Sequence, residues 1–159
     1  MDADLLSLFV PDLIQEDILE ISWKDIFDPI VLLNEDFKSS IDGSLAREFI
    51  KVTRLDIGKD YYIVPFDKYE CGRYSSYAAI LIDATDGHFI QASYVKEPVI
   101  YVPITKEEAI EAIIKDMPDA VKENIDARLV WQPGETSPSP FYPYWEVTVG
   151  EKIYYVTER

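Results

Sequence analysis

The sequence predicts an α+β fold, in which antiparallel sheets carry a helix packed on one face, and three observations lead to it. Segments rich in β-branched and aromatic residues are separated by turn residues over 49–94 and 127–157, as β-strands are. A helix-start signal at 105–108 precedes apolar residues at helical spacing. A glycine-led pair at 150–151 separates two strand-like segments. With 159 residues, 48% of them hydrophobic, the chain can bury a sizeable core in one ordinary domain or two very small ones.

Residues 1–40 differ from the rest and predict an acidic, helical N-terminal segment. Their apolar residues recur at roughly helical spacing, and Pro11 and Pro29 divide them into short pieces rather than one long helix. Residues 1–45 contain eleven acidic residues and only two lysines. A solvated acidic face explains this charge. A docking surface for a basic partner, or a mimic of nucleic acid, is the alternative.

Four strands are expected between residues 49 and 94. The first two are 49–55 and 61–66, and Pro65 places the second at a sheet edge or a strand end, because proline has no N–H to donate. Residues 77–83 and 88–94 flank a short loop that ends in glycine, which predicts a hairpin. Residues 96–103 then join the two halves of the chain, with Pro98 and Pro103 as stops.

Residues 105–117 predict a helix with a defined beginning and end. Thr105 and Glu108 form a capping box, in which the threonine side chain accepts from a free amide and the glutamate reaches back. Pro118 is expected to stop the helix. The apolar face consists of Ala109, Ile110, Ile113, Ile114 and Met117. Residues 127–131 follow as a strand.

The last two strands, 144–149 and 152–157, form a hairpin whose register can be predicted. A two-residue turn of Gly150 and Glu151, suited to type II′, sets Val149 opposite Lys152. The same register sets Val147 opposite Tyr154 and Trp145 opposite Val156, so these four side chains share one face and are expected in the core. Tyr144 and Tyr155 lie on the other face, toward solvent or a neighbouring element.

These segments resemble the PepSY domain, the module of bacterial metallopeptidase propeptides and spore-germination proteins. The resemblance rests on ITKEEAIEAI (104–113), ARLVW (127–131) and YWEVTVGEKIYYV (144–156). ILIDATDGHFIQASY (80–94) is a looser match to the family's other hairpin. Thr157 departs from the family, which often has an aspartate there. The resemblance implies two PepSY-like repeats, a degenerate one at 41–97 and a clearer one at 98–159, after the segment 1–40.

Charge and composition exclude several classes of function. The net charge of −15 leaves no basic stripe for phosphates, so nucleic-acid binding is not expected, and anionic membrane surfaces would repel the chain. No apolar run is long enough to insert into a membrane. The acidic start, Met1 to Asp4, does not fit a secretory signal, so the chain is expected to be soluble and untargeted as given. The compartment stays open, because most family members work outside the cytoplasm and a removed leader would place this chain there too.

The residues needed for catalysis are sparse. His88 is the single histidine and is expected on the surface of a hairpin turn, and Cys71 is the single cysteine, expected as a packed or unreactive thiol. A zinc site needs three or four ligands, and the acidic residues near 83–86 do not fit a calcium loop. The glycines are scattered singly and form no phosphate loop. We therefore expect no enzyme activity, no metal and no cofactor.

The sequence instead favours a non-catalytic protein-binding module. The proposed partner-binding residues are Phe141, Tyr142, Tyr144 and Tyr155, in and after a proline-stiffened loop at 136–144. Packing of Phe141 and Tyr142 over the sheet is the alternative. The resemblance implies a protein or peptide partner, such as a metallopeptidase that the chain inhibits or regulates. A different hypothesis is an acidic, immunity-type or mimic protein that neutralises a basic partner. The oligomeric state stays open.

Overall fold

The structure is a computed structural model that describes residues 34–117 and 124–157. Over these ranges, strands and two helices make an α+β fold, as predicted. The chain divides into two compact units: unit 1 comprises residues 1–51 and 60–100, and unit 2 comprises 52–59 and 101–159. The prediction of short helices in residues 1–33 lies outside the described residues, and so does most of the acidic segment.

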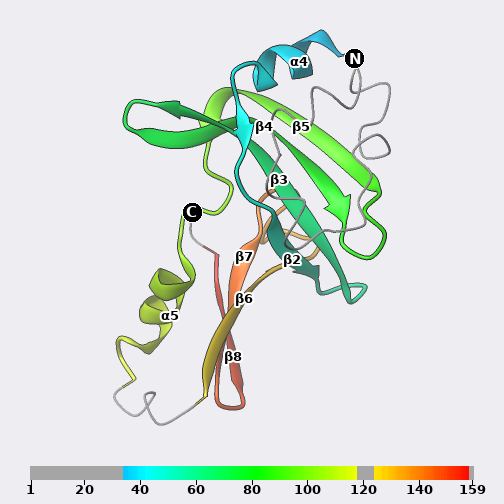
Figure 1. The fold of residues 1–159 in the computed structure, drawn as a ribbon. Helices are drawn as coiled ribbons and strands as arrows, with labels where there is room; N and C mark the ends of the chain where they lie inside the picture. The colour runs from blue at the N-terminus through cyan, green and yellow to red at the C-terminus, as the bar shows by residue number, and fades with distance from the viewer. Residues whose placement is uncertain (1–33, 118–123, 158–159) are drawn as a thin grey trace. The chain divides into compact units, whose positions relative to one another are not determined.

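From residue 34 onward, the described part of unit 1 consists of a helix and four strands (Figure 1). Strand β3 pairs antiparallel with β4 and with the short β1, and β4 pairs antiparallel with β5. The elements are α4 (Glu35–Ile41), β1 (Leu45–Ala46), β3 (Lys59–Glu70), β4 (Arg73–Asp83) and β5 (Phe89–Val99). The first residue of β3, Lys59, belongs to unit 2.

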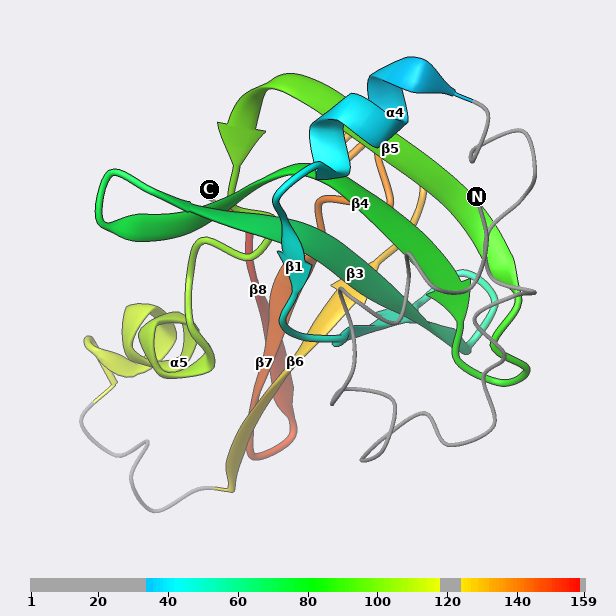
Figure 2. The same ribbon diagram turned by 45° about the horizontal axis from the view of Figure 1, so that its top comes forward.

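Helix α4 covers one face of the sheet of unit 1, as Figure 2 shows. Asn34 caps the helix, because its side chain accepts a hydrogen bond from the Phe37 amide at 3.0 Å. Phe37 and Ile41 are buried, and the Phe37 ring meets the Phe66 ring edge-on at 6.1 Å between centroids. The alternate residues of β3 and β4 that complete this core are Val64, Phe66, Ala78, Ile80 and Ile82.

The predicted hairpin of residues 77–94 is confirmed, as β4 and β5 around a turn at 84–87. In this turn Asp83 Oδ1 accepts hydrogen bonds from the amides of Thr85 at 2.7 Å and Asp86 at 3.4 Å. The expectation that Pro98 stops regular structure is wrong, because β5 continues to Val99. A proline is tolerated there because β5 pairs with β4 alone within residues 34–117 and 124–157, so its other edge needs no N–H.

Two further expectations about unit 1 are wrong. Pro65 lies well inside β3, opposite Ala79, rather than at a strand end, and β3 is not an edge strand because it pairs with β4 and β1. The register with β4 shifts directly after it, between Phe66 and Asp67, as irregular pairing next to a proline allows. Cys71 is exposed rather than packed, since it occupies the tight turn between β3 and β4 with φ 54, whereas the alternative of an unreactive thiol stays a prediction.

The residues of unit 2 that the structure describes form a helix and four strands. The elements are β2 (Ile50–Arg54), α5 (Lys106–Ile114), β6 (Ile125–Trp131), β7 (Tyr144–Val149) and β8 (Lys152–Val156). The first two residues of β2, Ile50 and Lys51, belong to unit 1. β6, β7 and β8 pair antiparallel in sequence order, whereas β2 pairs parallel with β6. The parallel pair corrects the expectation that all strands are antiparallel. Parallel strands need a long connection, and the chain between Arg54 and Ile125 provides one.

The predicted capping box of α5 is confirmed. Thr105 Oγ1 accepts from the Glu108 amide at 3.1 Å, and Glu108 Oε1 accepts from the Thr105 amide at 3.0 Å. The helix ends at Ile114, earlier than the predicted stop at Pro118, because the Met117 amide bonds to the Ile114 carbonyl and closes a tighter last turn. α5 packs its apolar face on one side of the strands β6, β7 and β8 (Figure 1).

The predicted register of the last hairpin is also confirmed. Val149 lies opposite Lys152, Val147 opposite Tyr154, and Trp145 opposite Val156. These residues, apart from Lys152, pack with Ala109 of α5 in one apolar cluster. Gly150 has φ 63, which a residue with a Cβ adopts only with strain. The indole of Trp145 also donates to the carbonyl of Ile104 at 2.8 Å, which ties the hairpin to the start of the helix.

Candidate protein-binding surfaces

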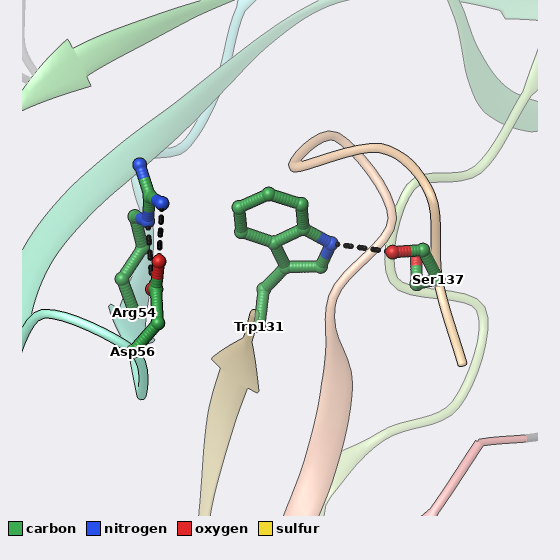
Figure 3. Close-up of polar contacts among 4 residues, drawn as sticks. All are labelled: Arg54, Asp56, Trp131 and Ser137. Atoms are coloured by element: carbon green, nitrogen blue, oxygen red, sulfur yellow. Dashed lines mark hydrogen bonds and ion pairs between the residues drawn. The ribbon is translucent and has the colours of Figure 1, made fainter. Parts of the chain in front are cut away.

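The proline-rich loop before β7 is held by its own hydrogen bonds. The Trp131 indole donates to the Ser137 carbonyl at 3.0 Å (Figure 3). The Ser137 hydroxyl lies 2.7 Å from the Tyr142 carbonyl oxygen and 3.2 Å from that of Ser139. The Tyr142 amide donates to the Ser139 carbonyl at 3.0 Å. Because Ser137 is buried and its partners are main-chain atoms, the loop has a defined shape before any partner binds.

Contacts between aromatic rings also hold this loop. Phe141 is buried, and its ring centroid lies 6.1 Å from that of Tyr101. Tyr142 is half-buried and stacks on Tyr101 at 5.8 Å with an interplanar angle of 28°. Both rings therefore lie against Tyr101, and the alternative that they pack over the sheet stays a prediction.

A bidentate ion pair lies on the side of the Trp131 indole away from Ser137 (Figure 3). Arg54 donates to Asp56 through Nε at 3.0 Å and Nη2 at 2.6 Å, and its guanidinium carbon lies 5.2 Å from the Trp131 ring centroid. The hydrogen bond from Arg54 lowers the pKa of Asp56 from its ordinary value. This arrangement positions the end of β6, where the Leu55 amide donates to the Trp131 carbonyl. It is a structural contact.

The face of β6, β7 and β8 opposite α5 carries a group of side chains that we call the outer hairpin face: Arg128, Tyr144, Glu146, Ile153 and Tyr155. Glu146 is buried and accepts from Arg128 Nε at 2.8 Å and from the Tyr155 hydroxyl at 3.4 Å. The Tyr144 and Tyr155 rings meet edge-on at 6.0 Å. Burial and the Glu146 carboxylate raise the pKa of Tyr155, so its hydroxyl stays a neutral donor at neutral pH.

The four sequence-predicted residues thus fall into two groups. Phe141 and Tyr142 lie with Tyr101, whereas Tyr144 and Tyr155 touch each other on the outer hairpin face. Tyr155 is 49% exposed, Phe141 2% and Tyr144 7%. That these four residues contact a partner stays a prediction. The exposure of Tyr155 favours it, whereas the burial of Phe141 and Tyr144 does not. Ile153, which is 54% exposed and lies beside Tyr155, was not among the partner-binding residues predicted from the sequence. The hairpin register alone places it there.

A second exposed surface, in unit 1, was not predicted at all. Beyond the bulge, β3 and β4 continue as an arm that projects from the sheet of the unit (Figure 2). Tyr69 is 64% exposed and lies opposite Tyr74, with 4.9 Å between ring centroids. The Arg47 guanidinium covers the Tyr74 ring at 3.6 Å. The sequence feature that could have indicated this surface is the pair of tyrosines that flanks the turn at Cys71 and Gly72. Their pairing could not be predicted, because the register of this hairpin depends on the bulge.

A buried carboxylate lies at the base of this arm. Asp67 accepts from the Ser76 hydroxyl through a short contact and pairs with Arg47 Nη1 at 3.2 Å. Burial raises its pKa, while the Ser76 hydrogen bond and the Arg47 charge oppose that rise. The carboxylate therefore anchors Arg47, which in turn lies over Tyr74.

Groups that could support catalysis are dispersed in the part of the chain that the structure describes. The His88 side chain is 70% exposed and pairs with Asp86 at 3.0 Å, which confirms the surface turn position. Within residues 34–117 and 124–157, no three His, Cys, Asp or Glu side chains gather where they could hold a metal ion. Neither described helix is long and apolar enough to cross a membrane.

Comparison with known proteins adds no relative. No family model, no curated protein and no solved structure matches the chain. The resemblance to the PepSY domain therefore stays a prediction that rests on the quoted segments.

Proposed function

We propose that the chain is a non-catalytic protein-binding module whose binding surface is the outer hairpin face. The observation that carries the proposal is the exposure of Ile153 and Tyr155 on an ordered strand. Glu146, which is itself paired with Arg128, accepts from the Tyr155 hydroxyl, and Tyr144 supports the Tyr155 ring, so the surface is formed before a partner arrives. A preformed tyrosine loses little conformational entropy on binding, which is one reason tyrosine is common at interfaces.

The partner that we propose is a peptidase, which the module inhibits or regulates. This rests on the resemblance to the PepSY domain, together with the proposed repeats at 41–97 and 98–159. The order of α5, β6, β7 and β8, with the helix across one face, is the order that the resemblance implies, and it supports the proposal. The buried side of the hairpin is occupied by α5, which leaves the outer hairpin face for the partner.

An inhibition assay tests this function. A metallopeptidase from the same cells should lose activity when the chain is added. The double variant Ile153→Thr and Tyr155→Ser should inhibit it at least about tenfold less, because it removes the central apolar contacts. A matched control is Tyr69→Ser, which removes an exposed tyrosine of unit 1 and should inhibit as wild type does. If no peptidase is bound or inhibited by the wild-type chain, the regulatory proposal is wrong.

A second proposal, favoured by charge, is that the chain neutralises a basic partner protein. The net charge of −15 would attract such a partner and speed its association. Capture of this partner should weaken steeply between about 50 and 500 mM salt, because exposed charges are then screened. Capture that is unchanged over that range would exclude charge as the mechanism and leave the apolar surface as the cause.

A further inference from the structure

Strand β8 ends the pairing order of unit 2. In the part of the chain that the structure describes, β8 pairs with β7 and with no other strand. Among these residues its second edge therefore has no strand partner. In the pairing order β8 lies beyond β7, at the end of the series β6, β7 and β8.

The hydrogen-bond register identifies which groups lie on that edge. The Gly150 amide donates to the Asn124 carbonyl at 2.8 Å, so Gly150 points its main chain toward the β6 side. Alternation along β7 then points the main chain of Val149, Val147 and Trp145 toward β8. Their partners on β8 use both main-chain groups to pair with β7. The N–H and C=O groups of Ile153 and Tyr155 consequently point away from β7, along the open edge.

The edge at β5, in unit 1, differs from the edge at β8. Along β5 the register with β4 shifts twice, and the strand contains Lys96 and Pro98. Bulges, lysines and prolines are the devices that keep an edge strand from pairing further. Strand β8 has a regular register over five residues and no proline, and only Lys152 at its start is charged. Its two outward residues also present large apolar side chains, Ile153 and Tyr155.

Charge indicates what kind of strand fits this edge. The exposed charged residues of α5, which packs against the same hairpin, are Lys106, Glu107, Glu108 and Glu111. Glu151 and Lys152 lie at the turn end of β8, so acidic residues outnumber basic ones here by four to two. A second copy of the chain would bring another net charge of −15 to the same place, and the two copies would repel each other. A basic segment would be attracted instead. Such a segment needs apolar side chains at alternate positions to cover Ile153 and Tyr155.

We propose that β8 binds an extended, basic peptide segment of a partner protein by strand addition, through the main chain of Ile153 and Tyr155. The incoming strand hydrogen-bonds to both residues and lays alternate apolar side chains on the outer hairpin face. This inference rests on the proposed binding function and specifies how the partner is held.

The test uses a defined probe with the full chain. The probe is a fluorescent ten-residue peptide of alternating valine and threonine with two lysines at each end. It should bind saturably, and a version with glutamates in place of the lysines should bind at least about tenfold more weakly. Two further versions carry N-methyl groups on alternate amides, one set for each edge of the peptide. One set should abolish binding and the other should not, because only one edge can pair with β8.

Two variants at one position separate the main chain from the side chain. In Ile153→Pro the lost N–H is the one on the open edge, so the pairing with β7 is kept while the edge is blocked. Peptide affinity should fall at least about tenfold, whereas Ile153→Thr, which keeps the N–H, should lose only about threefold. Thermal unfolding checks that both variants fold. If Ile153→Pro does not fold, the pair of N-methylated peptides decides the question alone.

Three outcomes would overturn the proposal. In the first, Ile153→Pro binds the peptide as wild type does. In the second, both N-methylated peptides bind equally. In the third, sedimentation shows a dimer that Ile153→Pro dissociates while the peptide does not bind, so that a second copy occupies the edge. The binding function can fail separately from strand addition. If Ile153→Pro still captures a protein partner, the binding function is supported and strand addition is rejected. If the peptide binds but wild type captures no protein partner, strand addition is supported and the binding function is rejected.

Discussion

Single side chains in this chain mostly hold main-chain segments in place, and Trp131 is the clearest case. Its indole donates to the carbonyl of Ser137, which lies in a buried turn. Trp131→Phe keeps most of the packing and removes the donor, so the free energy of unfolding should fall by about 1 kcal/mol. Amides of residues 137–142 should then exchange hydrogen faster than in wild type. Unchanged exchange there would mean that the other hydrogen bonds of the loop and the stacking on Tyr101 hold it without the indole donor.

Asp67 predicts a pH dependence of stability. Its pKa is raised in the folded chain, so between the ordinary value of 3.8 and that raised pKa the folded state binds more protons than the unfolded state. This group therefore stabilises the fold progressively as the pH falls through the raised pKa, and that contribution is lost as the pH rises. Urea unfolding of wild type and Asp67→Asn over pH 4–8 should show the difference in favour of wild type growing on acidification. Parallel curves would contradict the raised pKa.

Ser76 should matter to stability for the same reason. Its hydroxyl donates to the buried Asp67 carboxylate. Ser76→Ala leaves that carboxylate with fewer partners and should cost about 1–3 kcal/mol at neutral pH. Ser44→Ala serves as a control, since that hydroxyl donates to the Ile41 carbonyl rather than to a charge, and it should cost less. Equal losses for the two variants, measured by urea unfolding, would mean that the charge of Asp67 is irrelevant.

Among the elements, the last hairpin depends on the conformation of Gly150. With φ 63 this position suits glycine or asparagine, so Gly150→Ala should destabilise the chain by about 1 kcal/mol and Gly150→Asn by less. Chemical denaturation of the two variants measures the difference. If alanine is no worse than asparagine, the turn does not constrain the hairpin.

The elements also show what the sequence can and cannot predict. The capping box at Thr105 and the register across Gly150 were predictable, because both depend on residues within a few positions of one another. The parallel pairing of β2 with β6 was not, since nothing near Thr53 indicates a partner at Val130. The interior position of Pro65 depends on a bulge that forms only when β4 is in place. Of the candidate site, Tyr155 could be placed on the outward face, whereas the burial of Phe141 depends on the distant Tyr101.

For the whole molecule, the net charge of −15 bears on association more than on fold. We expect wild type to be monomeric at low salt, because two such chains repel each other, and sedimentation in about 50 mM salt tests this. A stable dimer under those conditions would show that apolar contact outweighs repulsion. It would also remove the charge argument for a basic partner.

The central claim is that the outer hairpin face binds a protein. Affinity capture from the native lysate with wild type and with the double variant Ile153→Thr and Tyr155→Ser tests it most directly. We predict at least one partner that wild type retains and the double variant loses, while Tyr69→Ser retains it. The claim would be contradicted if all three chains captured the same proteins, or if wild type captured none.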